Sequence, residues 1–137
     1  MSIPPMRTNA DITLYNKYLV ARVETFQRIQ ILNVAWEQRH ARSQFDSADL
    51  ATVYIPFARG TDYLKPHAWQ LLSSKANNWT LQIGDVIAKG LLSDELVTGT
   101  FTLSNLKAAY DDVLVINSVD TYDYGSFSMR HWAIGAR

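Results

Sequence analysis

The sequence contains no cysteine among its 137 residues. Disulfides, thiol nucleophiles and thiolate metal sites are therefore excluded. Long apolar runs are missing too, and the uncharged apolar stretches are far shorter than the ~20 residues that a membrane-spanning helix needs. The first eleven residues hold no apolar segment of signal-peptide length, so secretion is not expected.

An excess of charge of one sign is also absent, because 13 Lys and Arg balance 13 Asp and Glu. This balance argues against a dedicated nucleic-acid face. Hydrophobic residues make up 47% of the chain and charged residues 19%, which is enough for one core. We therefore expect one β domain over residues 11–137. The two adjacent prolines, Pro4 and Pro5, predict an extended N-terminal arm over residues 1–10.

Catalytic and metal-binding patterns are missing as well. His40, His67 and His131 have no second ligand at metal-binding spacing on a predicted element. The adjacent carboxylates Asp111 and Asp112 suit a helix end or a turn better than an acid–base pair. Residues 125–128 do not form a nucleophile elbow, and no glycine-rich phosphate loop is present. We expect no enzyme activity, no metal and no cofactor.

Alternation with period two is the main pattern that is present. It predicts a strand over 12–18. Residues 20–36 fit either a helix or a strand, but the helical stripe would include Gln27. A long bent strand fits better, because the apolar phase reverses once near Ile31, as it does at a β-bulge.

Further strands are predicted along the rest of the chain. Residues 50–57 are rich in β-forming types and should pair with 26–36 in a long hairpin, with Pro56 at an edge or a bulge. Thr102 should cap a short helix over 103–110. The other predicted strands are 79–83, 86–90, 113–116 continuing into 119–124, and 129–134.

These elements predict an all-β fold, a small antiparallel barrel or sandwich of about seven strands with one short helix and a long hairpin. The final strand should close the sheet, with Trp132 facing the core. The 16 aromatic residues favour core packing. A stacking platform for single-stranded nucleic acid is the alternative, and the zero net charge counts against it.

The most polar segment, 37–49, is the candidate contact site. It is either a solvated hairpin tip or an arm that reaches a neighbouring subunit, and its mixed charges favour protein over DNA. The N-terminal arm is a second candidate. The predicted contact residues are Glu37, Arg39, His40, Arg42 and Asp46.

Three segments carry a resemblance to a known group of proteins. They read ITLYNK at 12–17, IGDVIAKG at 83–90 and DYGSFSMRHWAIGAR at 123–137. Together they resemble a family of small phage and prophage proteins encoded among capsid and head–tail joint genes.

The resemblance implies a virion structural protein of the head–tail connector, in the head-closure (stopper) position. Copies would form a ring around the DNA channel, without sequence-specific DNA contact. Their partners would be adaptor, connector and tail proteins, and no membrane is expected. The location would be the virion neck after synthesis in the host cytoplasm. A tail-terminator or minor capsid role is the alternative within the virion. From other classes, a nucleic-acid-binding barrel comes next and an enzyme third.

Overall fold

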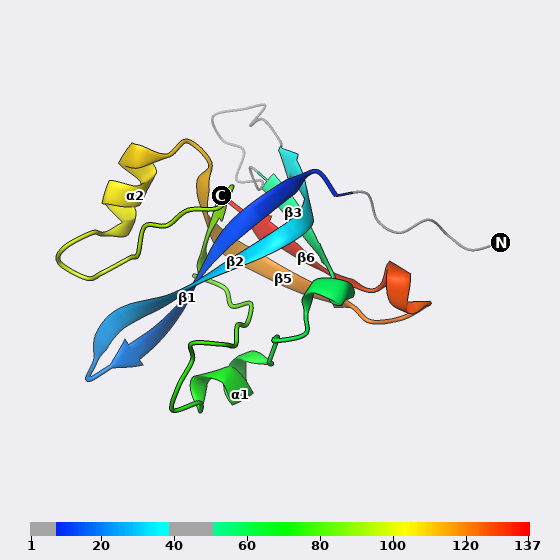
Figure 1. Cartoon of the computed structure of the whole chain (residues 1–137), viewed down its shortest axis with the longest axis horizontal. Helices are drawn as coiled ribbons and strands as arrows, with labels where there is room; N and C mark the ends of the chain where they lie inside the picture. The colour runs from blue at the N-terminus through cyan, green and yellow to red at the C-terminus, as the bar shows by residue number, and fades with distance from the viewer. Residues whose placement is uncertain (1–7, 39–50) are drawn as a thin grey trace.

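Six antiparallel strands form a closed barrel in the computed structural model, which describes residues 8–38 and 51–137 (Figure 1). The predicted all-β fold is confirmed, as a barrel and not a sandwich. Around the barrel the strands follow the order β1-β2-β3-β6-β5-β4. Their bounds are β1 (Ala10–Val20), β2 (Val23–Gln38), β3 (Ala51–Pro56), β4 (Val86–Lys89), β5 (Val113–Tyr122) and β6 (His131–Ala136).

Two short helices accompany the strands in the described chain. The helix α2 (Leu103–Ala109) follows Thr102 as predicted, and the Asn105 side chain accepts a 2.9 Å hydrogen bond from the Thr102 N–H. The helix α1 (Pro66–Gln70) begins on a proline, whose fixed φ suits a first helical turn. Neither helix is long and apolar enough to cross a membrane.

The longest hairpin joins β1 to β2, which pair from Val20 opposite Val23 to Ala10 opposite Val34. Its two-residue turn has positive φ at both positions, 49° at Ala21 and 69° at Arg22. This left-handed geometry matches the twist of paired strands. Because β4 pairs only with residues 12–15 of β1, the far end of the hairpin projects beyond the barrel (Figure 1).

A β-bulge interrupts β2 where the apolar phase reverses, so the prediction of a slip near Ile31 is confirmed. The register with β1 shifts between Ala10 and Ile12. Asn33 has a φ of 57° and its N–H donates to the Asp11 carboxylate at 2.9 Å. The extra residue lets Ile31 and Val34 both face the core.

The β2–β3 hairpin is shorter than predicted. Only Ala35–Gln38 pairs with Ala51–Tyr54, while residues 23–34 pair with β1 through the opposite edge of β2. Pro56 lies beyond the end of this ladder and pairs only with β6, so its missing N–H leaves no gap on the β2 side.

Two predicted strands differ from the structure. Residues 79–83 are not a strand: Trp79 forms a single bridge to Tyr63, and the N–H of Thr80 bonds to the Asn16 side chain instead of a ladder. The last strand starts at His131 and not at Met129, because residues 127–129 form a 3-10 turn. The described chain therefore has six strands where the sequence predicts about seven.

The core has two parts. The first fills the barrel interior, where Trp132 is only 5% exposed and contacts the rings of Phe57, Tyr63 and Trp79. Its predicted inward orientation is confirmed. The second part lies outside the barrel wall and is covered by α2 and the loop that precedes it. Its buried residues are Tyr15, Val86, Ala88, Leu92, Leu96, Leu106 and Val113.

Candidate interaction surface

Of the five predicted contact residues, only Glu37 falls within the described chain. It lies near the end of β2, opposite Thr52 of β3, and its side chain is exposed. The other four, Arg39, His40, Arg42 and Asp46, lie outside the described residues, and their role as contacts stays a prediction. β2 ends at Gln38 and β3 begins at Ala51, so the two strand ends that flank residues 39–50 lie together at one end of the barrel (Figure 1).

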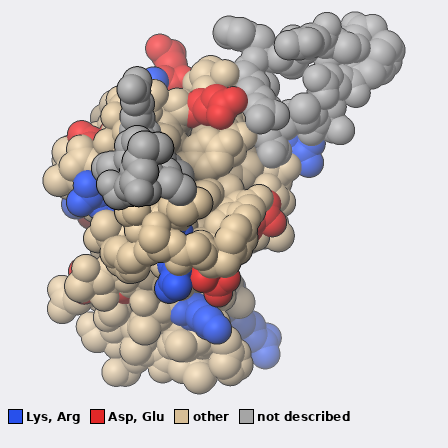
Figure 2. Space-filling model, turned by 90° about the vertical axis from the view of Figure 1, so that its right-hand side faces the viewer, with Lys and Arg blue, Asp and Glu red and all other residues tan. Residues whose placement is uncertain are grey.

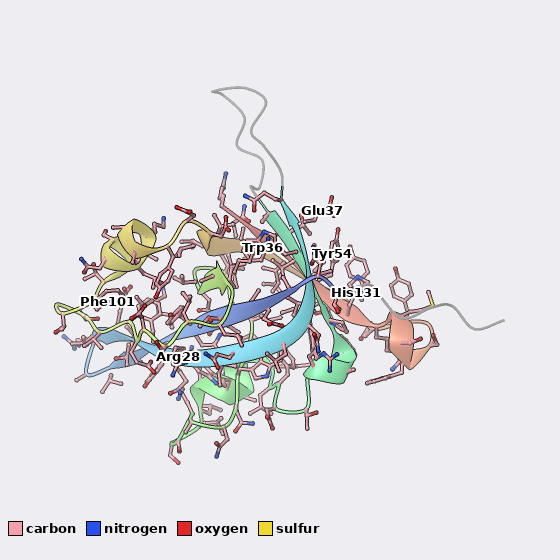
Figure 3. The ribbon with its side chains drawn as sticks, turned by 45° about the horizontal axis from the view of Figure 1, so that its top comes forward. Arg28, Trp36, Glu37, Tyr54, Phe101 and His131 are labelled. Atoms are coloured by element: carbon pink, nitrogen blue, oxygen red, sulfur yellow. The ribbon has the colours of Figure 1, made fainter. Side chains whose placement is uncertain are left out.

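Glu37 of β2 starts a row of polar and aromatic side chains that continues across β3, β6 and β5. The Tyr54 hydroxyl donates a weak 3.4 Å hydrogen bond to the Glu37 carboxylate. The His131 ring meets the Tyr54 ring edge-on, with the centroids 5.8 Å apart, and stacks on the Tyr122 ring at 4.8 Å. Figure 3 shows Glu37, Tyr54 and His131 along one side of the barrel. We call Glu37, Tyr54, His131, Tyr122 and Tyr124 the aromatic row.

Strand pleating places this row on the outer face. In β3, residues 51, 53 and 55 are buried in the core, so Tyr54 points outward. In β6, Trp132 and Ile134 face inward, so His131 points outward. Register then sets Tyr122 of β5 directly opposite His131. The sequence shows each alternation, but only strand pairing reveals that these three rings meet.

The row continues onto the exposed turn between β5 and β6. Tyr124 is 68% exposed and Phe127 61% exposed. The turn is held by the Arg130 guanidinium, which donates to the carbonyl of Gly125 at 3.2 Å. Exposed tyrosines and phenylalanines on a firmly held scaffold are typical of protein–protein interfaces.

Acidic residues flank the row. Asp120 lies on the same outer face, two residues before Tyr122. With Glu37, it gives this face two carboxylates beside the aromatic rings. Figure 2, seen from the right-hand side of Figure 1, shows charges of both signs dispersed among uncharged residues on the described surface. The carboxylates repel phosphate, so this row does not favour nucleic acid.

A separate polar cluster lies beside residues 16 and 17 of β1. It centres on Asp85, which is fully buried. Its carboxylate accepts hydrogen bonds from the Asn16 side chain at 2.8 Å and the Lys17 N–H at 2.9 Å, and the Gln82 amide donates to both of its oxygens. Burial raises the pKa of Asp85 to about 6, although these hydrogen bonds lower it.

The geometry of this cluster indicates a structural role. Both carboxylate oxygens are occupied by protein donors, and no part of Asp85 faces solvent. The same Asn16 amide also binds the carbonyl of Thr80 at 2.7 Å. Asn16 therefore ties the 80–85 segment to β1. No group of three or more metal-ligating side chains occurs among residues 8–38 and 51–137.

Comparison with known proteins identifies one relationship. A sequence profile described as a family of unknown function (DUF6751) matches residues 7–137. The chain belongs to this family. No curated protein and no solved structure matches it. The match spans all the described strands, so the barrel and the aromatic row both lie within the family's shared region.

Proposed function

We propose that this protein is a structural component of a tailed-phage virion, in the head-closure position of the head–tail connector. In this role, copies pack side by side in a ring around the DNA channel. The observation that supports it most is the aromatic row, an interface-like surface beside the ends of β2 and β3 that carry the predicted contact segment. The resemblance of residues 12–17, 83–90 and 123–137 to phage head–tail joint proteins supplies the virion assignment.

The geometry suits a ring subunit. A closed barrel presents a rigid scaffold, and side-by-side rings require a heterologous contact between two different surfaces of each copy. The aromatic row and the segment leaving β2 provide one such surface. Adaptor and tail proteins would bind the two faces of the ring. A tail-terminator or minor capsid protein would use the same kind of contact.

Mass measurement tests this proposal. The purified protein, alone and mixed with portal, adaptor and tail proteins of a candidate phage, should form a discrete species with a whole number of copies. Reversing the charges of Arg39 and Arg42 should weaken that species while the fold stays intact. A protein that remains monomeric in every mixture would contradict the ring.

A matched pair of variants distinguishes the effect of the aromatic row on assembly from that of any exposed apolar side chain. Tyr124→Ser removes an exposed ring from the aromatic row. Leu71→Ser removes a side chain that is 74% exposed but lies after α1, away from the row. We expect Tyr124→Ser to weaken assembly and Leu71→Ser to leave it unchanged. Equal behaviour of the two variants would remove the row from the interface.

The nucleic-acid-binding barrel is the second candidate. The ring pairs Tyr54–His131 and His131–Tyr122 resemble a stacking platform. The neighbouring carboxylates of Glu37 and Asp120 oppose it. Titration with labelled single-stranded DNA at low salt would decide: quenching of tyrosine fluorescence that disappears in Tyr122→Ala would support this candidate over the ring.

A further inference from the structure

Over residues 23–34, one edge of the long strand β2 has no neighbouring strand in the described chain. β3 pairs with β2 only over Ala35–Gln38, and the other side of β2 is occupied by β1. The carbonyl of Glu24 faces away from β1, because it accepts a hydrogen bond from the Thr98 hydroxyl. In an antiparallel ladder the N–H and C=O of one residue point to the same side and alternate along the strand. The backbones of Phe26, Arg28 and Gln30 therefore also point to the open side.

These backbone groups are unpaired within residues 8–38 and 51–137. No hydrogen bond there joins the main-chain N–H or C=O of Phe26, Arg28 or Gln30 to a partner. Phe26 and Arg28 are themselves half-buried. A row of unpaired donors and acceptors along a strand is a template for another strand.

A groove of about 330 Å³ runs beside the same edge. Residues 29–32 of β2 line it, together with Arg59, Asp62 and Trp79. Arg59 and Asp62 are exposed and form no ion pair among the described residues. An extended segment with side chains of both signs would complement this groove.

We infer that the open edge of β2 accepts residues 39–50 of a second copy as an added strand. This inference rests on the proposed ring and names the contact within it. Residues 39–50 contain no proline, so every residue can donate its N–H, and they carry Arg39, Arg42 and Asp46. The N-terminal arm is the poorer donor, because Pro4 and Pro5 cannot donate to a ladder.

Chain length requires that the donor be another copy. Fully extended, the links from Gln38 to Ala51 reach about 45 Å. A path along β2 from Gln38 to Arg28 and back to Ala51 needs roughly 60 Å at the rise of a strand, with the bulge taken into account. A copy therefore cannot lay its own segment along Phe26 and Arg28. Donation to the next copy joins two different surfaces, which generates a ring or a filament.

Two substitutions at one position isolate the backbone contribution. Gln30→Ala and Gln30→Pro both remove the side-chain hydrogen bond to the carbonyl of Leu92. Only Gln30→Pro also removes the outward N–H, which the β1–β2 ladder does not use. A synthetic peptide of residues 37–52 should bind Gln30→Ala at least about tenfold more tightly than Gln30→Pro, as expected for a lost hydrogen bond in an added strand. A scrambled peptide of the same composition is the control.

Amide exchange of the wild-type protein gives an independent readout should Gln30→Pro fail to fold. In the free protein the amides of Phe26, Arg28 and Gln30 should exchange quickly, while those of Thr25, Gln27 and Ile29 are protected. The peptide should slow exchange at the first three. Peptide binding without that protection, or equal affinity of the two variants, would overturn the inference.

The outcome is separable from that of the proposed function. If rings form equally well from Gln30→Ala and Gln30→Pro, the edge is not the contact and the ring stands. If the peptide binds as expected but no connector mixture contains rings, the strand acceptor stands and the connector role fails.

Discussion

Asn16 donates a 2.8 Å hydrogen bond to Asp85, a residue 69 positions away, and both side chains are fully buried. This pair fixes the segment that precedes β4 against β1. It also places an ionisable group where water cannot reach it, which makes the stability of the barrel depend on pH.

The first prediction concerns that pH dependence. Burial raises the pKa of Asp85 from 3.8 to about 6, so between these values the folded state holds a proton that the unfolded chain has released. The contribution of Asp85 to the free energy of unfolding is therefore fully present below about pH 4. It is lost as pH rises through about 6, by up to ~3 kcal/mol. Urea unfolding at pH 4 to 7 should show this decline.

Asp85→Asn provides the control for that experiment. The variant should lack the decline between pH 4 and 6. At pH 7 it should be less stable by about 2 kcal/mol, because the new amide turns a donor toward the donors of Lys17, Asn16 or Gln82. An unaltered pH profile in the variant would assign the titration to another group.

The second prediction concerns Trp132. Its ring lies 4.4 Å from those of Phe57 and Tyr63, centroid to centroid, and is almost fully buried. Trp132→Ala should lower the free energy of unfolding by ~3–5 kcal/mol. Leu71→Ala, at an exposed position, should change it by less than about 0.5 kcal/mol.

Deleting residues 129–137 removes β6 and should prevent folding. A cooperative thermal melt of the shortened protein would contradict the central place of β6.

The third prediction tests a close contact at Gly60. A Cβ added there would lie 2.5 Å from one carbon of the Trp132 ring and 2.9 Å from another. The φ of Gly60 is −96°, so backbone strain plays no part. Gly60→Ala should destabilise the barrel by about 1–3 kcal/mol. In a Trp132→Phe background the added cost should shrink, and a double-mutant cycle of unfolding free energies measures the difference.

The fourth prediction is a gain in stability at the β1–β2 turn. Ala21 and Arg22 both adopt left-handed conformations that L residues with a Cβ disfavour. Replacing the pair with Asn-Gly should raise the unfolding free energy by about 1 kcal/mol or more. Chemical denaturation measures it, with Arg22→Ser as a control that keeps the Cβ and should bring no such gain.

The local pattern of the sequence predicts much of the barrel. Alternation located the strands, and the phase reversal near Ile31 located the bulge because the core fixes which residues face inward. The Ala21–Arg22 turn was missed because neither residue is a glycine or an asparagine. The 79–83 segment alternates like a strand but is held by side chains, so its pattern reflects burial of Trp79 and Leu81 and not a ladder.

The candidate sites were less accessible to sequence analysis. The aromatic row depends on the pairing of three strands, and His131 on its own reads as an ordinary strand residue. Asp85 looks like one half of a Gly-Asp turn until Asn16 is brought beside it. The open edge of β2 follows from the point at which β3 stops pairing, which no periodicity encodes. Contacts between distant segments decide all three.

The position of β6 between β3 and β5 has a consequence for synthesis on the ribosome. Ala136 pairs with Ala51 and with Ile116. Neither β3 nor β5 can complete its ladder until the last strand has left the exit tunnel, so the barrel cannot close while the chain is still growing through that region. Pairing across a separation as long as that between β3 and β6 is slow. One edge of β3 and one edge of β5 therefore stay unpaired and exposed until β6 joins them.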